Sequence, residues 1–395
     1  MMKMKPLFMA VTALLAASCV FPFDAETVDG SGSLVVEGDI LIGEVTKVAL
    51  GLTYPVGGSP ETVCRGTVWI EDDAGKEYFA DKWYDQNQKT MYEIDTRDAD
   101  PSRQYRLHVD AVGVKGGHDY ESSWQSVSLA PEIDSLSYLK DPERSRFNIT
   151  LSMHSEKGSF FKWTYIEDWE YHSDYRATYI YHPPQTGWWG TNGYGTMEEL
   201  VPPDNIYYCY GHEESSEILT FSTEKQTDDR FVDLEFRKIP RDDIRISFYY
   251  RIKVFLEALD KEAYTYWENM KTNSEYNGNL FAPTPSEMVG NIRCVQDPDE
   301  LVIGYISAAQ RAKKTLFLDA ADIQYYKRNE PYQEPVLLES PLDWYQYYSR
   351  ERFLPYSSVV PHDTSQTYWA PARCVDCRER GGTLTKPDDW PFLHW

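Results

Sequence analysis

Two cysteines near the end of the chain, Cys374 and Cys377, are the first residues whose type and spacing could do chemistry. They begin the stretch CVDCRERGGTLTKPDDWP (374–391), and such a pair serves as a redox dithiol, as half of a zinc site or in structural disulfides. A redox pair stands at the start of a helix in a βαβ unit, where the helix N-terminus lowers the thiol pKa. Here a turn sequence, Arg-Glu-Arg-Gly-Gly, follows the pair, and the chain has no βαβ pattern. The redox interpretation is therefore disfavoured.

Zinc is the second interpretation of the same pair. A zinc site needs four ligands, and Cys374 with Cys377 supplies two of them. Cys294 with His362 or His394 would complete a site, but no second pair of ligands has zinc-finger spacing. We therefore expect no metal and favour structural disulfides.

The N-terminus indicates the compartment in which these cysteines are located. Lys3 and Lys5 precede a short apolar run (7–17), so residues 1–18 have the layout of a signal peptide rather than of a membrane span. Cys19 follows Ala-Ala-Ser, as in the bacterial lipobox, and we expect cleavage before Cys19 and acylation of its thiol. A plain signal peptide with an incidental cysteine is the alternative, because the usual leucine stands one position too early. Export in either form leads to an oxidising compartment, where disulfides persist.

Five cysteines remain after Cys19, so at least one of them is left without a disulfide partner. We predict that Cys294 joins Cys374 or Cys377 and that Cys209 takes the other. Cys64, in the first half of the chain, is then the odd thiol.

The composition excludes some classes of partner. The chain carries 39 Lys and Arg against 63 Asp and Glu, which gives a net charge of −24, and it has no basic cluster. Nucleic acids and anionic lipid surfaces are disfavoured as partners, because both require clustered basic side chains. Behind the leader, no stretch approaches the roughly 18 apolar residues of a membrane helix. We expect a soluble body behind an N-terminal tether, and 395 residues suffice for two domains.

The alternation of apolar and polar residues predicts an all-β fold. Residues 19–32 form the lipidated tether, and residues 33–131 contain short alternating runs separated by turns, which is typical of an immunoglobulin-like β-sandwich. Residues 132–395 are predicted to form a larger antiparallel β-rich domain. Its longest strand signal has strict period two from Ile244 to Leu256.

One or two short helices are expected within this second domain. Asp260 is placed to cap a helix over 261–273, and Ser340-Pro341-Leu342-Asp343 has the cap, the first-turn proline and the acid that begin a helix over 341–353. Further strands are expected at ELVIGYISAA (300–309) and KKTLFLDAADI (313–323).

Four motifs of the second half occur together in a recognisable order. They are EAYTYWENMK (262–271), GNLFAPTPSEMVGNIRC (278–294), DPDELVIGYISAA (297–309) and the cysteine-containing stretch 374–391. With the lipobox and the N-terminal LVVEG strand, they resemble the Bacteroidota lipoproteins grouped as domain of unknown function 4249. The resemblance covers nearly the whole mature chain.

The resemblance implies an outer-membrane lipoprotein with an N-terminal β-sandwich, often found together with TonB-dependent transporters. It implies no established reaction. Surface lipoproteins of these bacteria usually carry acidic residues directly behind the lipidated cysteine, whereas here residues 20–23 precede Asp24 and Glu26. This spacing departs from the usual pattern, but acidic residues do follow the cysteine closely, and we favour the cell surface over the periplasmic face of the outer membrane.

Catalytic signatures are absent from the sequence. It contains no G-x-S-x-G, H-E-x-x-H, P-loop or dinucleotide fingerprint, and its eight histidines are scattered. His182 and His212 flank an aromatic segment, but solvated loop histidines are the simpler interpretation. The acidic stretches 95–100 and 297–300 lack the EF-hand pattern, and acid-rich turns are expected at this net charge. We therefore expect no enzyme and no cofactor.

The most suggestive surface feature is the aromatic segment YIYHPPQTGWWGTNGYGTMEEL (179–200). Trp188, Trp189 and Tyr194 lie among glycines, and such rings stack on sugars or insert into a protein partner. A loop that packs onto its own domain is the alternative.

Three classes of function compete. The first is an accessory lipoprotein docked on a TonB-dependent transporter, which captures or gates cargo, and the second is a free-standing surface protein that binds a glycan or a polypeptide. A hydrolase is the third and is disfavoured, because no constellation of residues supports it.

Overall fold

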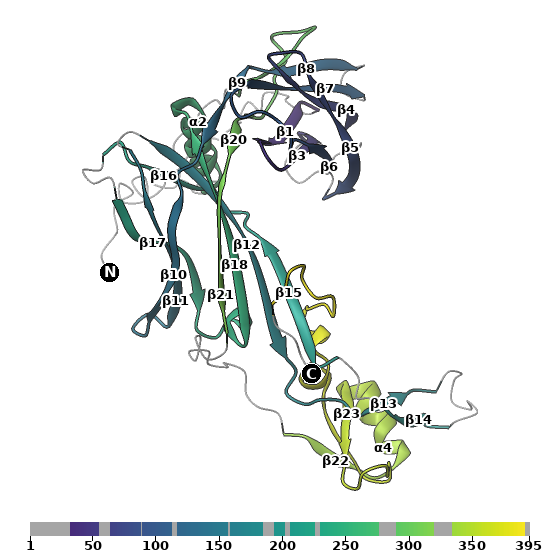
Figure 1. Cartoon of the computed structure of the whole chain (residues 1–395). Coiled ribbons are helices and arrows are strands. Elements are labelled where there is room, and N and C mark those ends of the chain that lie inside the picture. The colour runs from purple at the N-terminus through teal and green to yellow at the C-terminus, as the bar shows by residue number, and fades with distance from the viewer. Residues whose placement is uncertain are drawn as a thin grey trace, which may run out of the picture.

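The computed structural model describes ten stretches of the chain, namely residues 32–54, 64–87, 89–112, 117–156, 159–184, 193–201, 206–225, 230–275, 290–319 and 334–391. Over these residues the fold is all-β with a few short helices, as the sequence predicts. Two sandwiches and a small terminal lobe follow one another along an elongated molecule (Figure 1). None of the helices in the described stretches is both long and apolar enough to cross a membrane.

The first sandwich is built where alternating strands are expected, and its inward residues are aliphatic or aromatic. In β6, for example, every second residue of KTMYEID is buried, as is expected for a strand with one face toward a core. The strands are β1 (Leu34–Gly38), β2 (Ile40–Leu41), β3 (Val45–Leu52), β4 (Arg65–Asp72), β5 (Glu77–Gln86), β6 (Lys89–Asp95), β7 (Gln104–Val112), β8 (His118–Ser122) and β9 (Gln125–Leu129).

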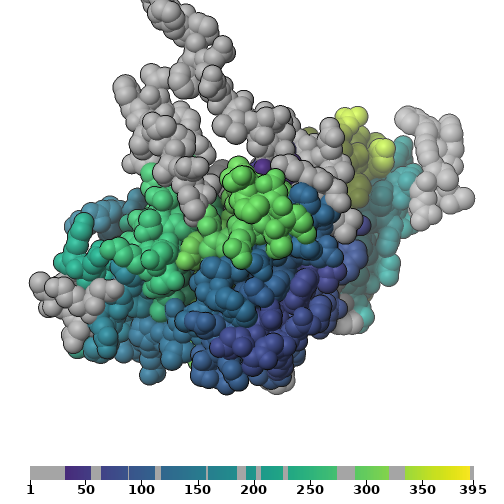
Figure 2. All heavy atoms as spheres, turned by 90° about the horizontal axis from the view of Figure 1, so that it is seen from above, coloured from purple at the N-terminus to yellow at the C-terminus, as the bar shows by residue number. Residues whose placement is uncertain are grey.

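Residues 290–310, which we call the return segment, complete this first sandwich from far along the chain. β19 (Ile292–Cys294) pairs with β8, and β20 (Ala308–Gln310) lies between β2 and β9 in parallel register. Figure 2 shows this green segment against the purple and blue of the first sandwich. These residues, which are assigned from the sequence to the domain 132–395, therefore pair with strands of the first sandwich.

Only part of the strand expected at 300–309 forms, and a glycine explains its irregular path. Gly304 has a φ of +152°, and a Cβ there would overlap the carbonyl oxygen of Val36 and lie 3.0 Å from Ile292 Cδ1. Ile303 exchanges backbone hydrogen bonds with Leu34 and Val36, at 2.9 and 2.8 Å. The segment thus lies directly against β1 before it becomes β20.

The second sandwich packs a three-stranded sheet on a five-stranded one. Its core lies between them, with Phe147 and Ile149 on one side and residues of β12 and β18 on the other. The first sheet has the order β10 (Ile133–Asp141), β11 (Arg146–His154), β17 (Arg230–Pro240); the second has the order β15 (Tyr208–Glu214), β12 (Phe160–His172), β18 (Tyr249–Leu259), β21 (Ala312–Leu318), with β16 (Leu219–Ser222) also on β12.

The long strand predicted from Ile244 starts later than expected. The Asp243 side chain accepts a hydrogen bond of 3.0 Å from the Arg245 amide and starts a 3₁₀ turn, η1 (Ile244–Ile246), so that β18 begins at Tyr249. From Tyr250 onward the predicted alternation holds, because Tyr250, Ile252, Val254 and Leu256 are all fully buried.

Both predicted helices form at their expected caps. The Asp260 carboxylate accepts a hydrogen bond of 2.7 Å from the Ala263 amide at the start of α2 (Lys261–Glu275). The Ser340 hydroxyl accepts one of 3.2 Å from the Asp343 amide at the start of α4 (Pro341–Gln346), which continues as the wide turn η2 (Tyr347–Glu351).

The terminal lobe surrounds the fully buried Trp369. Figure 1 shows the lobe at the end of the molecule opposite to the first sandwich. Besides α4 and η2 it contains β13 (Tyr179–His182), β14 (Thr196–Glu199), β22 (Val336–Leu338), β23 (Phe353–Ser358) and β24 (Thr367–Pro371), which are followed by α5 (Ala372–Val375) and η3 (Cys377–Arg380).

Candidate functional site

A cleft of about 760 Å³ lies between the first sandwich, the second sandwich and α2. Its walls are formed by half-buried apolar side chains, while charged and amide side chains surround its mouth. The wall residues include Leu41, Val45, Met91, Ile166, Ile218, Leu219, Phe255, Trp267 and Met270, and the rim includes Glu37, Lys47, Gln86, Asn87, Lys89, Glu214 and Glu217. Ligand sites are typically clefts of this size and character at domain boundaries.

A buried lysine lies at the floor of the cleft. Lys162 on β12 forms ion pairs with Asp39 of the first sandwich and with Glu257 of β18, the latter at 3.1 Å from Nζ to Oε2. Its ammonium group also lies 4.4 Å from the centre of the Trp267 ring. Burial alone would lower the pKa of Lys162, but the attraction of Asp39 and Glu257 raises it, so the group stays charged. Ser307 in turn donates a hydrogen bond of 2.5 Å to Asp39.

A second ion-pair group joins the two sandwiches beside this floor. The Arg311 guanidinium donates to both carboxylate oxygens of Glu44, at 2.8 and 2.7 Å, and stacks 4.0 Å from the centre of the Phe255 ring. Lys313 adds a third contact to Glu44 at 2.8 Å. Burial alone would raise the pKa of Glu44, but the hydrogen bonds from these two cations outweigh it and lower the pKa. These contacts fix the walls of the cleft relative to each other.

The cleft residues were not identified from the sequence, although the position of Lys162 in the sequence could have indicated a buried ion pair. It is a lysine inside a strongly apolar strand, FFKWTYIEDWEY, and a buried lysine requires a carboxylate partner. The partners Asp39 and Glu257 lie 123 and 95 positions away in the sequence, and nothing in the sequence marks them as close.

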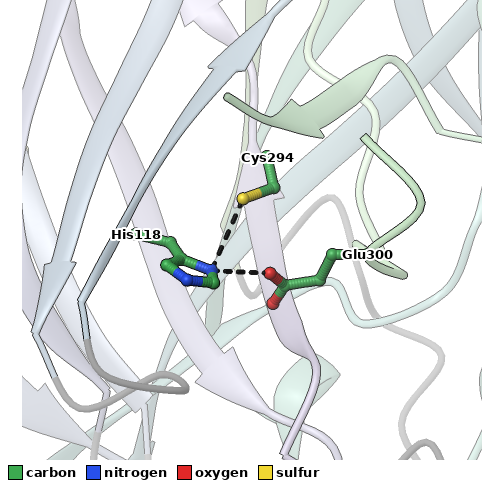
Figure 3. A group of neighbouring side chains, drawn as sticks. All are labelled: His118, Cys294 and Glu300. Carbon is green, nitrogen blue, oxygen red and sulfur yellow. Dashed lines mark hydrogen bonds and ion pairs between the residues drawn. The ribbon is translucent and has the colours of Figure 1, made fainter. Parts of the chain in front are cut away.

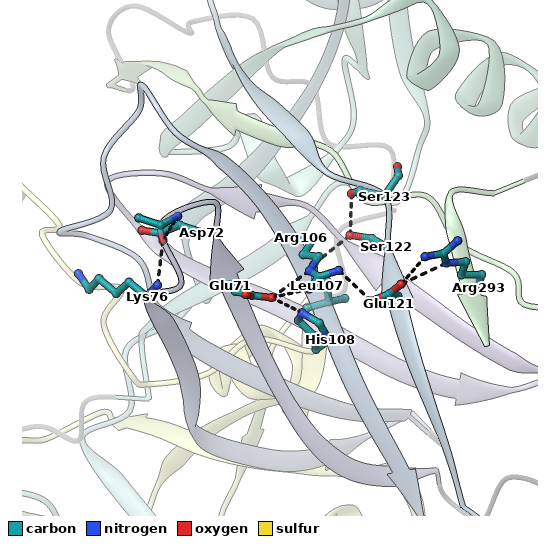
Figure 4. Close-up of polar contacts among 11 residues, drawn as sticks. Glu71, Asp72, Lys76, Arg106, Leu107, His108, Glu121, Ser122, Ser123 and Arg293 are labelled. Atoms are coloured by element: carbon teal, nitrogen blue, oxygen red, sulfur yellow. Dashed lines mark hydrogen bonds and ion pairs between the residues drawn. The ribbon is translucent and has the colours of Figure 1, made fainter. Parts of the chain in front are cut away.

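The outer face of the first sandwich carries linked charged side chains (Figure 4), and aromatic side chains lie beside them. Trp69 on β4 is stacked between Phe79 and His108, with ring centres 5.8 and 4.8 Å away. Arg106 on β7 lies over the ring of Trp124, at 4.6 Å from its centre. Phe79 and Trp124 are 52% and 39% exposed, so this face offers rings to solvent.

Ion pairs hold the polar part of this face in a fixed arrangement. Arg106 donates to Glu71 and to Glu121, each at 2.9 Å, and Arg293 of β19 approaches Glu121 at 2.5 Å. Burial raises the pKa of Glu71, but hydrogen bonds from Arg106 and His108 outweigh this effect and lower it. The return segment therefore contributes to this surface as well as to the core.

The cysteines are arranged differently from the predicted pattern. Cys209 on β15 forms a disulfide with Cys377, with an S–S distance of 2.06 Å, so the assignment of Cys209 to one member of the C-terminal pair agrees with the structure. Cys294, Cys374 and Cys64 are buried and outside any disulfide, and the predicted bond from Cys294 to Cys374 or Cys377 is therefore wrong.

Cys294 lies beside two residues that the sequence did not connect with it. Its Sγ is 3.5 Å from His118 Nδ1, and the same nitrogen is 2.8 Å from Glu300 Oε2. Burial raises the pKa of the Cys294 thiol, which backbone N–H groups partly counteract. His362, considered above as a zinc ligand with Cys294, instead contacts Glu199 at 2.8 Å. His394 lies outside the described residues.

The aromatic segment is described only in part. Trp188 and Trp189 lie outside the described residues, as do the leader, Cys19 and the tether as far as residue 31. Tyr194 is 48% exposed, its backbone carbonyl accepts a hydrogen bond from the Tyr181 hydroxyl, and its ring centre lies 6.4 Å from that of Tyr345. Its role in binding stays a prediction.

The remaining polar candidates have local partners. His182 contacts Glu198 at 2.7 Å, and His212 contacts Asp168 at 2.8 Å. In the acidic stretch 95–100, Asp95 and Asp100 accept hydrogen bonds from the amides two residues further on, as acid-rich turns do. In 297–300, Glu300 is the residue that joins His118 and Cys294.

Comparisons with known proteins identify a family but no activity. Residues 20–315 match the sequence model of the family described as Domain of unknown function (DUF4249). The comparison with curated proteins found no match. A similar solved structure is a DUF4785 family protein from Legionella pneumophila subsp. pneumophila, at 10% sequence identity and a TM-score of 0.18; the match covers 57% of this chain and 50% of that one. The chain thus spans about half of that protein.

Proposed function

Because this chain belongs to the family of the domain of unknown function 4249, we propose that it is a non-enzymatic accessory lipoprotein of a TonB-dependent transporter. In this proposal Cys19 carries the lipid that anchors it in the outer membrane of one of the Bacteroidota, with its body at the cell surface. The protein captures or gates the cargo of the transporter and catalyses no reaction.

The observation that carries this proposal is the cleft between the two sandwiches. Its volume of about 760 Å³ suits a small molecule or a short stretch of polypeptide. Its apolar walls supply binding energy through burial, and the charges of the rim supply orientation. Lys162 and Arg311 are both paired with carboxylates, which supports a role in holding the walls rather than in reacting with a ligand.

The test of the accessory role is a pull-down from the outer membrane in mild detergent at native abundance. We expect a TonB-dependent transporter to be recovered with the protein. Recovery of the protein alone would rule out the accessory role. Metabolic labelling with a palmitate analogue tests the anchor separately, since Cys19→Ala removes the label only if Cys19 is the acylated residue.

The role of the cleft is tested with a charge placed on its wall. Ile218 lines the cleft and is half-buried, so Ile218→Arg fills the cleft with a cation without emptying a core. Val232→Arg is the matched control, because Val232 is 57% exposed on β17 and does not line the cleft. We expect I218R to retain the transporter but to lose the small molecules or peptides that mass spectrometry detects with the wild-type protein. Equal ligand content in I218R and V232R would exclude the cleft as the ligand-binding site.

A free-standing surface protein that binds a glycan is the second candidate, and the outer face of the first sandwich favours it. Exposed rings held on a sheet face present large apolar areas that stay rigid, and such areas concentrate binding energy. Phe79→Ala removes one ring from the stack with Trp69 at an exposed position, so folding should be little changed. Reduced retention of F79A on a glycan array, with I218R unaffected, would favour this candidate over the accessory role.

A further inference from the structure

Three side chains with metal-binding atoms converge at one end of the first sandwich (Figure 3). His118 begins β8, Cys294 ends β19, and Glu300 lies in the turn that follows β19. Their donor atoms all lie within 4.8 Å of one another, and Cys294 and Glu300 are buried. His118 is 22% exposed at its side chain, so the group is open to solvent on one side.

The spacing of the three donor atoms suits a tetrahedral ion. Ligand bonds of about 2.0–2.3 Å at tetrahedral angles place neighbouring donor atoms about 3.3–3.6 Å apart. The distance from Cys294 Sγ to His118 Nδ1 is already 3.5 Å, whereas that from His118 Nδ1 to Glu300 Oε2 is 2.8 Å. For an ion to be held by all three, this second distance has to open by about half an ångström, and Cys294 Sγ and the carboxylate oxygen of Glu300, which lie within 4.8 Å of each other, have to be about 3.6 Å apart.

The surroundings orient both anionic ligands. The amide of Asp297 points at Cys294 Sγ with an N···S distance of 3.4 Å, so a backbone donor fixes the position of the sulfur. Tyr120 donates a hydrogen bond of 2.9 Å to Glu300 Oε1, which leaves Oε2 directed at the centre of the group. Such outer partners are the usual support of metal ligands.

The same geometry argues against a nucleophilic triad. In a cysteine–histidine–acid relay, one ring nitrogen faces the nucleophile and the other faces the acid. Here a single nitrogen, Nδ1 of His118, faces both Cys294 and Glu300, as Figure 3 shows. This arrangement suits an ion bound between the three donor atoms. It does not suit a proton relay, which needs both ring nitrogens of the histidine.

We propose that His118, Cys294 and Glu300 bind one Zn²⁺ ion, with a water molecule as the fourth ligand on the exposed side. Zinc accepts nitrogen, sulfur and oxygen donors at these distances. A thiolate and a carboxylate together neutralise its charge, which suits a largely buried site. The ion joins the return segment, through Cys294 and Glu300, to β8, through His118. This role is independent of the cleft and of the proposed transporter.

The test uses the mature chain after treatment with EDTA, titrated first with Co²⁺ and then with Zn²⁺. We expect one Co²⁺ per chain, with near-ultraviolet absorption from thiolate-to-cobalt charge transfer, and its displacement by Zn²⁺. Cys294→Ala should abolish the absorption, and Glu300→Gln and His118→Ala should weaken Zn²⁺ binding by more than about 10-fold. Tyr120→Phe, which changes only the support of Glu300, should weaken it by about 10-fold to 100-fold.

Two variants control for thiols and histidines in general. Cys374→Ala removes another buried thiol, and His362→Ala removes a histidine bonded to Glu199, so both should bind like the wild type. Circular dichroism of the metal-free variants shows whether they fold; if C294A does not, E300Q, which keeps the shape of Glu300, carries the test. The proposal is overturned if the wild type gives no thiolate absorption, or if E300Q and H118A bind Zn²⁺ as tightly as the wild type.

Discussion

Two segments run back to a sandwich that is built largely from earlier residues. One is the return segment (290–310), and the other consists of the residues after β24, which we call the C-terminal strap (372–391). The return segment is held by backbone pairing on both sides, with β8 at one end and with β2 and β9 at the other. The Asn291 side chain adds two hydrogen bonds to the backbone of Ile306, at 2.7 and 2.8 Å. This segment is part of a sheet.

The C-terminal strap is attached differently. Its backbone meets β15 where Thr383 and Tyr210 exchange hydrogen bonds of 2.9 and 2.8 Å. Elsewhere its backbone makes separate hydrogen bonds, such as that of 3.0 Å from the Cys377 amide to the Ile206 carbonyl. Side chains add to the attachment, since Trp390 donates a hydrogen bond of 3.0 Å to the buried Glu170. The covalent bond between Cys377 and Cys209 closes a separation of 168 residues at the other end of the strap.

The two segments differ in how their cysteines are used. Cys294 lies in the segment that strand pairing fixes, and Cys377 lies in the segment that depends on fewer backbone contacts. Where strand pairing holds both ends of the segment, Cys294 is not needed for a covalent bond and lies among metal-binding groups. Where pairing is short, Cys377 holds the strap through a disulfide buried against Tyr171, whose hydroxyl donates a hydrogen bond of 2.9 Å to the Cys377 carbonyl. The first two experiments below alter the attachment of the strap, and the last experiment examines Cys64, the other thiol of the first sandwich.

Removal of the disulfide should have the largest effect. The variant with Cys209→Ala and Cys377→Ala should lose about 2–5 kcal/mol in the free energy of unfolding, because the unfolded chain gains freedom when so long a loop is no longer closed. Urea unfolding followed by tryptophan fluorescence measures the loss. The control is Cys374→Ala, a buried thiol of the same strap outside the disulfide. Equal stability of the two variants would show that the strap is held without the bond.

The sequence predicted the elements of both segments better than their attachments. Alternation predicted most of β18 and most of the strands of the first sandwich, because period two reflects one buried face and is a local property. The caps of α2 and α4 were predicted for the same reason, since Asp260 and Ser340 bond to amides three residues away. The start of β18 was missed because the local bond from Arg245 to Asp243 overrides the alternation there.

What the sequence could not predict depends on contacts between distant residues. The return segment was assigned to the second domain because it lies there in the sequence, and parallel pairing with β2 and β9 leaves no local signal. The partner of Cys294 was sought among cysteines, whereas His118 is 176 positions away and on another strand. The cleft likewise arises from the packing of two domains, and no local pattern encodes its shape.

A glycine next to the disulfide should show how closely the strap is packed. A Cβ at position 382 would overlap the Tyr171 hydroxyl and lie 2.8 Å from Cys209 Cβ, so Gly382→Ala should cost about 1–3 kcal/mol in the free energy of unfolding. The neighbouring Gly381 has a φ of +88° and no atom within 4 Å of a built Cβ. Asparagine adopts positive φ more readily than other side chains do, so Gly381→Asn should cost less than Gly382→Ala, although some backbone strain is expected. Thermal unfolding compares the two, and similar losses would mean that backbone strain rather than packing limits this turn.

The smallest effect concerns Cys64, the thiol of the first sandwich that is neither in the disulfide nor in the group around Cys294. Burial raises its pKa to about 11, from 9.0 for an ordinary thiol. At pH 8 its thiolate fraction is thus about 100-fold below that of the unfolded chain, and alkylation requires the thiolate. The raised pKa makes stability depend on pH. The stabilising contribution of the protonated thiol is fully present below pH 9.0. It is lost as the pH rises toward 11, because the unfolded chain releases the Cys64 proton in this range while the folded chain still binds it.

The experiment measures the rate at which iodoacetamide alkylates Cys64 in the native protein between pH 7 and pH 10, with detection by peptide mass spectrometry. The pH dependence of this rate distinguishes slow reaction caused by a raised pKa from slow reaction caused by inaccessibility. Inaccessibility lowers the rate by the same factor at every pH, so the rate would still level off near pH 9.0 as for an ordinary thiol. A raised pKa instead lets the rate grow about tenfold per pH unit over the whole range. A plateau at pH 9 would therefore contradict the raised pKa, whereas a continued rise would show that Cys64 is kept as a neutral core residue. The sandwich closed by the return segment would then contain one cysteine used only for packing and one, Cys294, surrounded by metal-binding groups.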